Sequence, residues 1–124
     1  MDQLTLAFLL LALLLAKHWI ADFVIQFNYM VVEKGIYGAP GGLHHAGIHA
    51  FFTAVIFLLV VPLPLALLLG AVDGVIHYHV DWLKMKINRW RSLDTHQSEY
   101  WAWLGADQLA HNYTYLALVY WAVS

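Results

Sequence analysis

The sequence has no cysteine and few charged residues. Charged residues make up 11% of the 124 residues, against about 25% in a typical soluble domain. The absence of cysteine excludes disulfide bonds, thiolate metal sites, iron–sulfur clusters and a cysteine nucleophile, so nitrogen and oxygen atoms must hold any bound metal. Eight acidic and six basic residues give a formal net charge of −2. Because nucleic-acid binding calls for a basic surface, we expect no nucleic-acid partner.

Apolar residues are abundant instead. They account for 62% of the chain, against about 45–50% in soluble domains even when glycine is counted. This composition is typical of a membrane protein, and 124 residues allow one domain. The first apolar run, Leu4 to Ala16, has no basic region before it and continues through His18 without a small-residue cleavage site. We therefore predict a retained helix and not a signal peptide.

Clusters of glycine, proline and polar residues divide the chain into four long segments. Roughly 20 helical residues are needed to cross the hydrocarbon core of a bilayer, and each segment comes close to or exceeds that length. We predict an all-α fold, namely an integral membrane bundle of four antiparallel transmembrane helices. The expected helices cover residues 4–33, 44–61, 65–90 and 100–122.

The basic residues predict the orientation of this bundle. The termini and the turn at Pro62–Pro64 contain no lysine or arginine, whereas the first and third predicted loops do. By the positive-inside rule, the first and third loops should be cytoplasmic and both termini should lie outside the cytoplasm, across the inner membrane. The basic residues in or near these loops are Lys34, Lys84, Lys86, Arg89 and Arg91.

Each predicted helix carries a stripe of histidine and aspartate residues. In the third helix, Asp73, His77 and Asp81 are spaced at i, i+4 and i+8, so they share one face. All the stripes fall in the cytoplasmic half of their predicted helices. We therefore expect them to face one another at a single site. The other stripes are His18, Asp22 and Gln26 in the first helix, His45 and His49 in the second, and Asp107 and His111 in the fourth.

These stripes predict a metal site. An aspartate near the bilayer centre costs about 2.5–3.5 kcal/mol, so four unpaired aspartates would cost on the order of 10 kcal/mol. A divalent cation held by carboxylates and neutral imidazoles removes that cost, and zinc, iron and manganese all accept such ligands. The candidates are too many for one tetrahedral ion. Either two ions lie close together, which we favour with zinc as the metal, or some candidates only orient the imidazoles. The candidate ligands are His18, Asp22, His45, His49, Asp73, His77, Asp81, Asp107 and His111.

Other polar residues each allow two interpretations. His44 and His79 fall off the stripes and are expected at the membrane interface. Lys17 is expected to reach solvent with its ammonium group or to pair within the bundle. Lys84 is either a membrane anchor or the group that binds an anionic part of a substrate, and Gln26 is either a hydrogen-bond partner of the site or an interfacial residue. We assign Lys84 and Gln26 to the candidate catalytic set.

Several motifs together carry a resemblance to a known family. They are His18-Trp-Ile-Ala-Asp22-Phe23-Val-Ile-Gln26, His45-xxx-His49, His77-xxx-Asp81-xx-Lys84 and Asp107-Gln108-xx-His111. In this combination, the chain resembles the DUF3307 family of small multi-pass membrane proteins from bacteria and phages over nearly its whole length. The resemblance implies a membrane fold and supports the choice of polar residues, but the family has no assigned activity. Asp73 is the candidate ligand that fits the family pattern least well, so its assignment rests on spacing alone.

The leading functional hypothesis is a metal-dependent hydrolase acting on a lipid-borne ester or phosphoester at the cytoplasmic leaflet. Water can reach a site near the interface, where a metal activates it and a carboxylate serves as general base. Membrane lipids are then the surroundings and a lipid-like molecule is the substrate. The alternatives are a membrane di-iron oxygenase acting on acyl chains and a non-enzymatic bundle that handles metal or protons. In that last case, the His–Asp pairs hydrogen-bond across helices.

Overall fold

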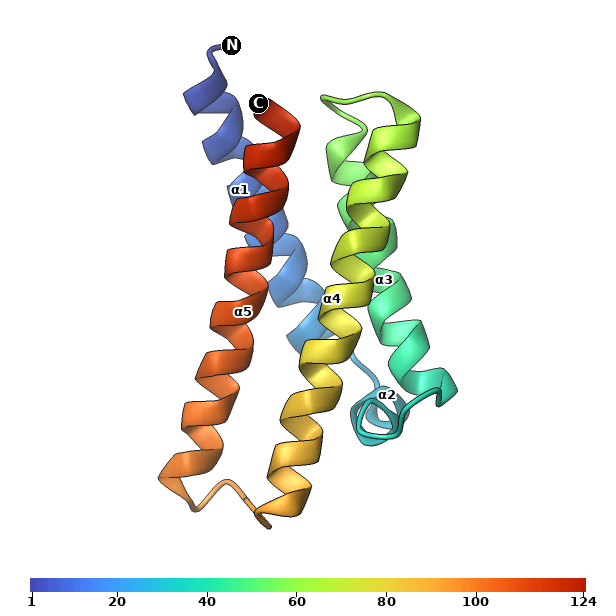
Figure 1. Cartoon of the computed structure of the whole chain (residues 1–124), viewed down its shortest axis with the longest axis vertical. Coiled ribbons are helices and arrows are strands. Elements are labelled where there is room, and N and C mark those ends of the chain that lie inside the picture. Colours follow the sequence, from blue (N-terminus) through green and yellow to red (C-terminus); the bar gives the residue numbers. More distant parts are fainter.

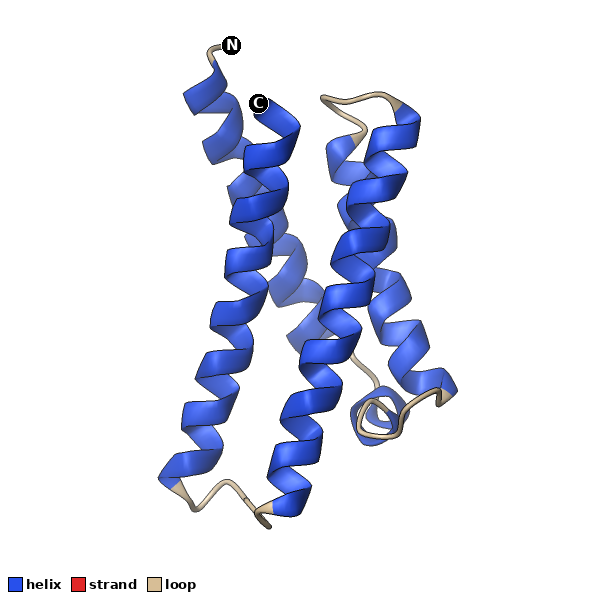
Figure 2. Cartoon of the chain, in the orientation of Figure 1, coloured by secondary structure: helices blue, strands red, loops and turns tan.

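The fold is built entirely of helices (Figure 2). A computed structural model describes residues 1–124, of which 81% are helical and none is in a strand, so the predicted all-α class is confirmed. A short π-helix, η1 (Ile20–Val24), directly follows the first α-helix. The five α-helices are α1 (Gln3–Trp19), α2 (Asn28–Glu33), α3 (Pro40–Phe57), α4 (Leu63–Trp90) and α5 (Ser98–Val123).

Four long helices form an antiparallel bundle, and α2 lies crosswise at one end (Figure 1). Both termini and the connection between α3 and α4 lie at the opposite end. The side chain of Gln3 ties the termini together by donating from Nε2 to the carbonyl oxygen of Val123 at 3.0 Å. Helices α3 and α4 pack closely because Gly70 has no side chain. A Cβ atom there would lie 2.5 Å from the carbonyl oxygen of Ala50.

The first predicted helix, residues 4–33, is divided into α1, η1 and α2. The N–H of Ile25 donates to the carbonyl oxygen of Ile20 at 3.0 Å, which is the i to i+5 bond of a π-helix. No glycine or proline marks this break, so the sequence pattern did not reveal it. The second helix begins at Pro40 instead of residue 44, because proline suits the first turn of a helix as well as a loop.

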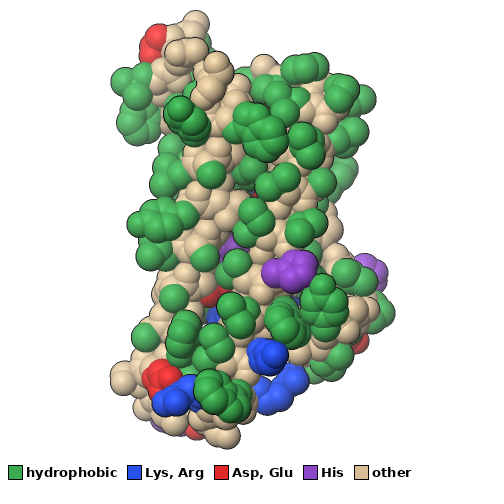
Figure 3. Space-filling view, viewed as in Figure 1, with side chains coloured by type: hydrophobic (Ala, Val, Ile, Leu, Met, Phe, Trp, Pro, Cys, Tyr) green, Lys and Arg blue, Asp and Glu red, His purple; other side chains and the backbone are tan.

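The two ends of the bundle have different interiors. The end that holds the termini contains a hydrophobic core formed by Leu10, Leu14, Phe57, Ala66, Leu69, Tyr115, Leu118 and Val119. The other end is polar inside. Of the 31 buried residues, 13 are hydrophobic and 13 are polar or charged, although charged residues are rarely buried in soluble proteins. On the face shown in Figure 3, by contrast, apolar side chains are spread along the whole length of the bundle, and basic side chains gather at the end opposite the termini.

Two helical segments are long and apolar enough to cross a membrane. They cover Gln3–Val24, with 22 residues, and Leu63–Trp90, with 28 residues. Helices α3 and α5 do not meet the same criterion. The four-span bundle expected from the sequence is therefore not confirmed beyond these two candidate spans.

An exposed ion pair bridges the connection between α4 and α5. Arg91 Nε lies 2.6 Å from Glu99 Oε1. The hydrogen bond from Arg91 lowers the pKa of the Glu99 carboxyl. Because both side chains face solvent, this pair is expected to contribute little to stability.

Candidate metal centre

Five of the eight histidines are buried in the polar half of the bundle. They come from α1, α3, α4 and α5, and four buried aspartates lie among them. His44 and His79, which fall off the stripes, are exposed. The i to i+4 spacing therefore separates the inward histidines of each helix from the outward ones. The buried set is His18, His45, His49, His77 and His111 with Asp22, Asp73, Asp81 and Asp107.

Two imidazoles and two carboxylates meet at the centre of this cluster. The Nε2 atoms of His45 and His77 are 3.1 Å apart. Asp22 Oδ1 lies 3.1 Å from the first of these nitrogens and 3.6 Å from the second. Asp81 Oδ2 lies 3.3 Å from both. Four ligand atoms at about 2.0–2.1 Å from a tetrahedral zinc ion would be separated by about 3.3–3.4 Å, so these four atoms have the spacing of a coordination shell.

Unpaired polar atoms support the same interpretation. The Oδ2 atom of Asp81, one of the four ligand atoms, is buried without a hydrogen bond. The Nδ1 atoms of His45 and His77 are also unpaired, but they are not ligand atoms of this centre. Two Nε2 atoms that face each other at 3.1 Å cannot both carry a proton without repulsion. A cation between them would bind both lone pairs and would also bind Asp81 Oδ2, whose cationic neighbour is otherwise the Lys34 ammonium at 3.4 Å. The residues present therefore fit a metal ion held by nitrogen and oxygen.

His49 and His18 are held as proton donors. The ammonium of Lys17 lies 3.1 Å from His49 Nδ1, and because an ammonium can only donate, this nitrogen accepts. The proton of neutral His49 is then on Nε2, 2.9 Å from Asp22 Oδ1. His18 Nε2 lies 2.8 Å from the carbonyl oxygen of the Gln108 side chain, which can only accept. It also lies 3.2 Å from Asp22 Oδ2, so both imidazoles orient this carboxylate.

His111 links the centre to a second carboxylate. Its Nε2 atom lies 3.2 Å from Asp81 Oδ1 and 3.2 Å from Asp107 Oδ1. Distances between potential ligand atoms define two groups, and within each group all these atoms lie within 4.8 Å of one another. The first group is Asp22, His45, His49 and His77, and the second is His77, Asp81 and His111. The two groups share His77, so the cluster is continuous.

Three lysines neutralise most of the buried negative charge. Lys17 uses all three donors, on Asp73 Oδ2 at 3.0 Å, the Tyr115 hydroxyl at 3.1 Å and His49. Lys34 Nζ lies 3.4 Å from the Asp81 carboxylate, and Lys84 Nζ lies 3.0 Å from the Asp107 carboxylate. With neutral histidines, four carboxylates and three ammonium groups leave a net charge of −1.

Two of the predicted site residues, Asp73 and Gln26, do not contact the centre. Asp73 lies away from the centre, because its carboxylate accepts from Lys17 and, at 2.6 Å, from Thr53 Oγ1. Gln26 does not reach the centre either. Its Nε2 atom donates to the backbone carbonyl of Asp22 at 2.7 Å, and its Oε1 atom accepts from Lys34 at 3.0 Å. Gln26 therefore holds η1 and Lys34 in place.

Several members of the network were not predicted as site residues. Thr53 and Tyr115 lie four residues after His49 and His111, so extending each stripe by one step would have found them. Gln108 follows Asp107 directly within the Asp107-Gln108-xx-His111 motif. Lys34 was interpreted as a loop charge, yet its side chain is buried and turned inward. Its orientation depends on how the 34–39 connection folds back onto α3.

Comparison with known proteins adds the family. A family model described as "Protein of unknown function (DUF3307)" matches residues 9–124. The chain belongs to the DUF3307 family. The matched range contains every residue of the buried cluster. No curated protein and no solved structure matches the chain. Membership of DUF3307 therefore supplies no reaction, and the function has to be argued from the site.

Proposed function

We propose that this DUF3307 protein is an integral membrane metalloprotein that binds one divalent cation between Asp22, His45, His77 and Asp81. The supporting observation is the spacing of the four ligand atoms. Five of the six distances between them are 3.1–3.6 Å, and a tetrahedral zinc ion requires about 3.3–3.4 Å. Zinc is favoured, and iron and manganese accept the same ligand types.

The distribution of polar and apolar residues supports the membrane location. A core helix of a soluble protein is mostly buried, but only 28% and 39% of the most apolar stretches of the two candidate spans are buried here. An exposed apolar surface of this extent suits lipid contact. Lys86, Arg89 and Arg91 are exposed at the end opposite the termini, which favours that end as cytoplasmic. All four long helices would then cross the bilayer, with both termini outside the cytoplasm.

The buried charges favour one ion over the two expected from the sequence. A single dication changes the net charge of the cluster from −1 to +1, whereas two dications would raise it to +3. Lys84 already contacts Asp107 at 3.0 Å, the carboxylate beside His111 that a second ion would need. The di-iron alternative loses support for the same reason.

For the reaction, we propose hydrolysis of a lipid-borne ester or phosphoester. When bound, the ion supplies Lewis-acid activation of water. Asp81 is the candidate general base because only its Oδ2 atom would bind the ion, which leaves its second oxygen, Oδ1, beside His111 at 3.2 Å, to take up a proton. It would accept the proton of the attacking water and return it to the departing alcohol oxygen. Lys84 would pair with an anionic group of the substrate.

A hydrogen-bonded chain favours proton handling as a second candidate function. It starts at Asp73, runs through Lys17 and Tyr115 to His18, and ends at Asp22, with steps of 3.0, 3.1, 2.9 and 3.2 Å. Every member is buried, and chains of this type carry protons in membrane proteins. If the purified protein contains stoichiometric metal, metal binding is the main function, and these hydrogen bonds serve to hold Asp22 and His18 in position.

Metal content tests the metalloprotein. We expect about one zinc, iron or manganese ion per chain after purification in detergent, and His77→Ala should lower that content at least tenfold. The matched control is His79→Ala, two positions along the same helix but exposed, which should retain the metal. Equal losses from the two variants, or a metal-free wild-type protein, would contradict the proposed centre.

Product release from lipid esters and phosphoesters tests the reaction. We expect Asp81→Asn to lower the hydrolysis rate per bound metal ion by about 10²–10⁴, the usual contribution of a general base; expressing the rate per ion separates this effect from any loss of metal, because Asp81 is also a proposed ligand. Asp94→Asn, at an exposed position, is the control. A metal-loaded wild-type protein that releases no product from either substrate class would exclude hydrolysis and leave the metalloprotein standing.

A further inference from the structure

The end of the bundle covered by α2 is closed over the polar cluster. Lys34 is buried there and donates to Gln26 at 3.0 Å. The N–H of Gly41 donates to the Glu33 carboxylate, and a Cβ atom at Gly41 would lie 2.7 Å from the carbonyl oxygen of Tyr29. The start of α3 thus packs directly against α2 and the segment that follows it. A ligand cannot enter from this end without unpacking that contact.

A pocket of about 160 Å³ opens on the flank of the bundle instead, between α4 and α5. Its walls are apolar and include Leu83, Trp103 and Ala106, and its only charged lining residues are Lys84 and Asp107. In Figure 3, acidic, basic and histidine side chains are recessed between these two helices among apolar side chains. The flank therefore gives access to charged groups through a surface that faces lipid in the proposed orientation.

The ammonium of Lys84 has free hydrogen-bond donors. Its ammonium has three donors, and its hydrogen bond to Asp107, at 3.0 Å, uses one of them. Behind this pair, His111 lies 3.2 Å from Asp107 and 3.2 Å from Asp81, so the pocket leads to the proposed centre. With one dication bound, the cluster carries a net charge of +1. An anion in the pocket would balance that charge.

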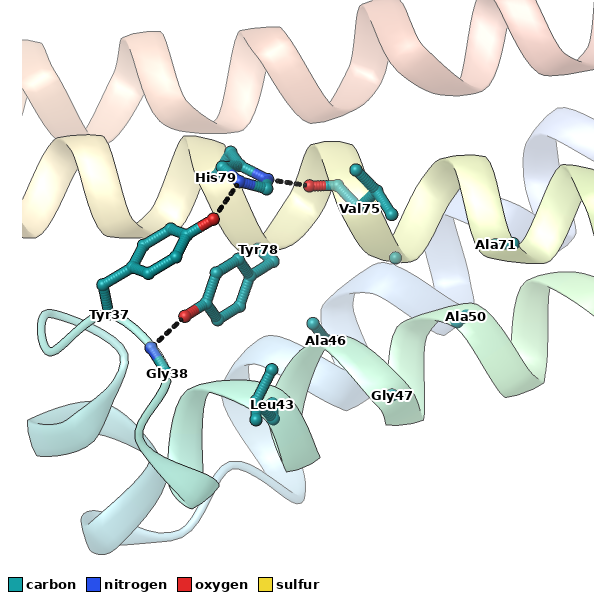
Figure 4. Close-up of a pocket in the computed structure, with 11 residues that line it drawn as sticks. Tyr37, Gly38, Leu43, Ala46, Gly47, Ala50, Ala71, Val75, Tyr78 and His79 are labelled. Carbon is teal, nitrogen blue, oxygen red and sulfur yellow. Dashed lines mark hydrogen bonds between the residues drawn. The ribbon is translucent and has the colours of Figure 1, made fainter.

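A larger groove between α3 and α4 lacks these features (Figure 4). It holds about 450 Å³ and has no charged lining residue. Its polar atoms are already paired, since the Tyr37 hydroxyl lies 2.9 Å from His79 Nε2 and His79 Nδ1 lies 2.7 Å from the carbonyl oxygen of Val75. The N–H of Gly38 likewise donates to the Tyr78 hydroxyl at 2.6 Å. This groove offers nothing to recognise an anion.

We infer that the pocket between α4 and α5 is a lateral portal for a lipid with an anionic phosphate head group. The phosphate binds the free donors of Lys84, and the acyl chains lie along the apolar walls toward the bilayer. The inference deepens the proposed function, because it rests on the membrane location proposed there. The charge of a bound ion would strengthen the attraction, but the free donors of Lys84 are present with or without the ion. It names the substrate class as anionic phospholipids that enter sideways.

Quenching of Trp103 tests this inference in the full chain. The protein is placed in nanodiscs of phosphatidylcholine containing phosphatidic acid, with bromine on the acyl chains of one lipid at a time. The Trp103 signal is the difference between the wild type and Trp103→Phe. We expect brominated phosphatidic acid to quench this signal at about a tenfold lower mole fraction than brominated phosphatidylcholine.

Two variants with a matched control sharpen the test. Lys84→Gln should abolish the preference for phosphatidic acid, and Ala106→Phe, at an exposed position that lines the pocket, should reduce quenching by both lipids. Ala117→Phe is the control, since Ala117 is also exposed and lies about three turns further along the same face of α5. It should behave as the wild type.

The outcomes separate this inference from the proposed function. Equal quenching by the two lipids, an unchanged preference in Lys84→Gln, or equal effects of Ala106→Phe and Ala117→Phe would each overturn the portal. Displacement of phosphatidic acid by inorganic phosphate at a matching concentration would show that free phosphate is the ligand, and would also overturn it. Metal content is measured on the same samples. A protein that prefers phosphatidic acid but contains no metal would support the portal and contradict the proposed metal centre.

Discussion

The ion pair between Lys17 and Asp73 provides a quantitative test of the buried network. Lys17 Nζ lies 3.0 Å from Asp73 Oδ2, and the two side chains are 6% and 1% exposed. Lys17→Met removes all three hydrogen bonds of the ammonium and leaves the carboxylate with Thr53 as its remaining donor. Asp73→Asn leaves a buried ammonium without a counter-ion. Each single variant should therefore be strongly destabilised.

The expected size follows from the burial of the pair. Removing one partner of a buried ion pair costs about 3–5 kcal/mol. Helices unfolded in detergent find other partners for their polar groups, which lowers such effects in membrane bundles, so we expect about 3 kcal/mol for each single variant. The double variant Lys17→Met/Asp73→Asn removes both charges together and should lie within about 1–2 kcal/mol of the wild type. The coupling free energy would then be about 4–5 kcal/mol.

The assay is a double-mutant cycle by unfolding in mixed micelles of mild detergent and dodecyl sulfate. The matched control is the exposed pair of Arg91 and Glu99, where Arg91→Met and Glu99→Gln should show no measurable coupling. If the Lys17 and Asp73 variants are additive, the two side chains do not interact as the structure places them. The count of buried charges that favours a single metal ion would then be lost as well.

Three further predictions can be checked independently. Chelation should lower the melting temperature in detergent, because it leaves Asp22 and Asp81 facing each other in a low-dielectric interior; an unchanged melting temperature would argue against a structural contribution of the metal. A C-terminal alkaline phosphatase fusion should be active and a fluorescent fusion dark, and the reverse result would invert the proposed orientation. Gly70→Ala should destabilise the bundle, because the added Cβ would contact the backbone of α3. The control Gly105→Ala, with no atom within 4 Å of the added Cβ, should stabilise the bundle by up to about 1 kcal/mol. Equal effects of the two substitutions would contradict the close packing of α3 and α4.

Helical periodicity alone was sufficient to identify the inward-facing histidines and aspartates. The spacing of four residues placed His45 and His49 on the interior and left His44 outside, and it separated His77 from His79 in the same way. This works because the direction of a side chain on a regular helix depends only on its position along the chain. The all-α class followed equally directly from long apolar segments punctuated by glycine and proline.

Tertiary structure decided which of these inward residues share a centre. Asp73 and Asp81 lie on one stripe, but two helical turns separate them by about 12 Å, so one pairs with Lys17 while the other joins His45 and His77. Only the packing of α3 against α4 determines which carboxylate meets which imidazole. Periodicity fixes the direction of a side chain but not the height at which two helices meet.

The tertiary fold also determined the position of the lysines. Lys34 comes from a connection whose path depends on the break after η1, and no glycine or proline in residues 20–33 signals that break. The sequence by itself determined that carboxylates and imidazoles face the interior of a helical bundle. The structure alone showed that three ammonium groups join them, because such contacts link residues far apart in the chain, and no local pattern encodes their distance.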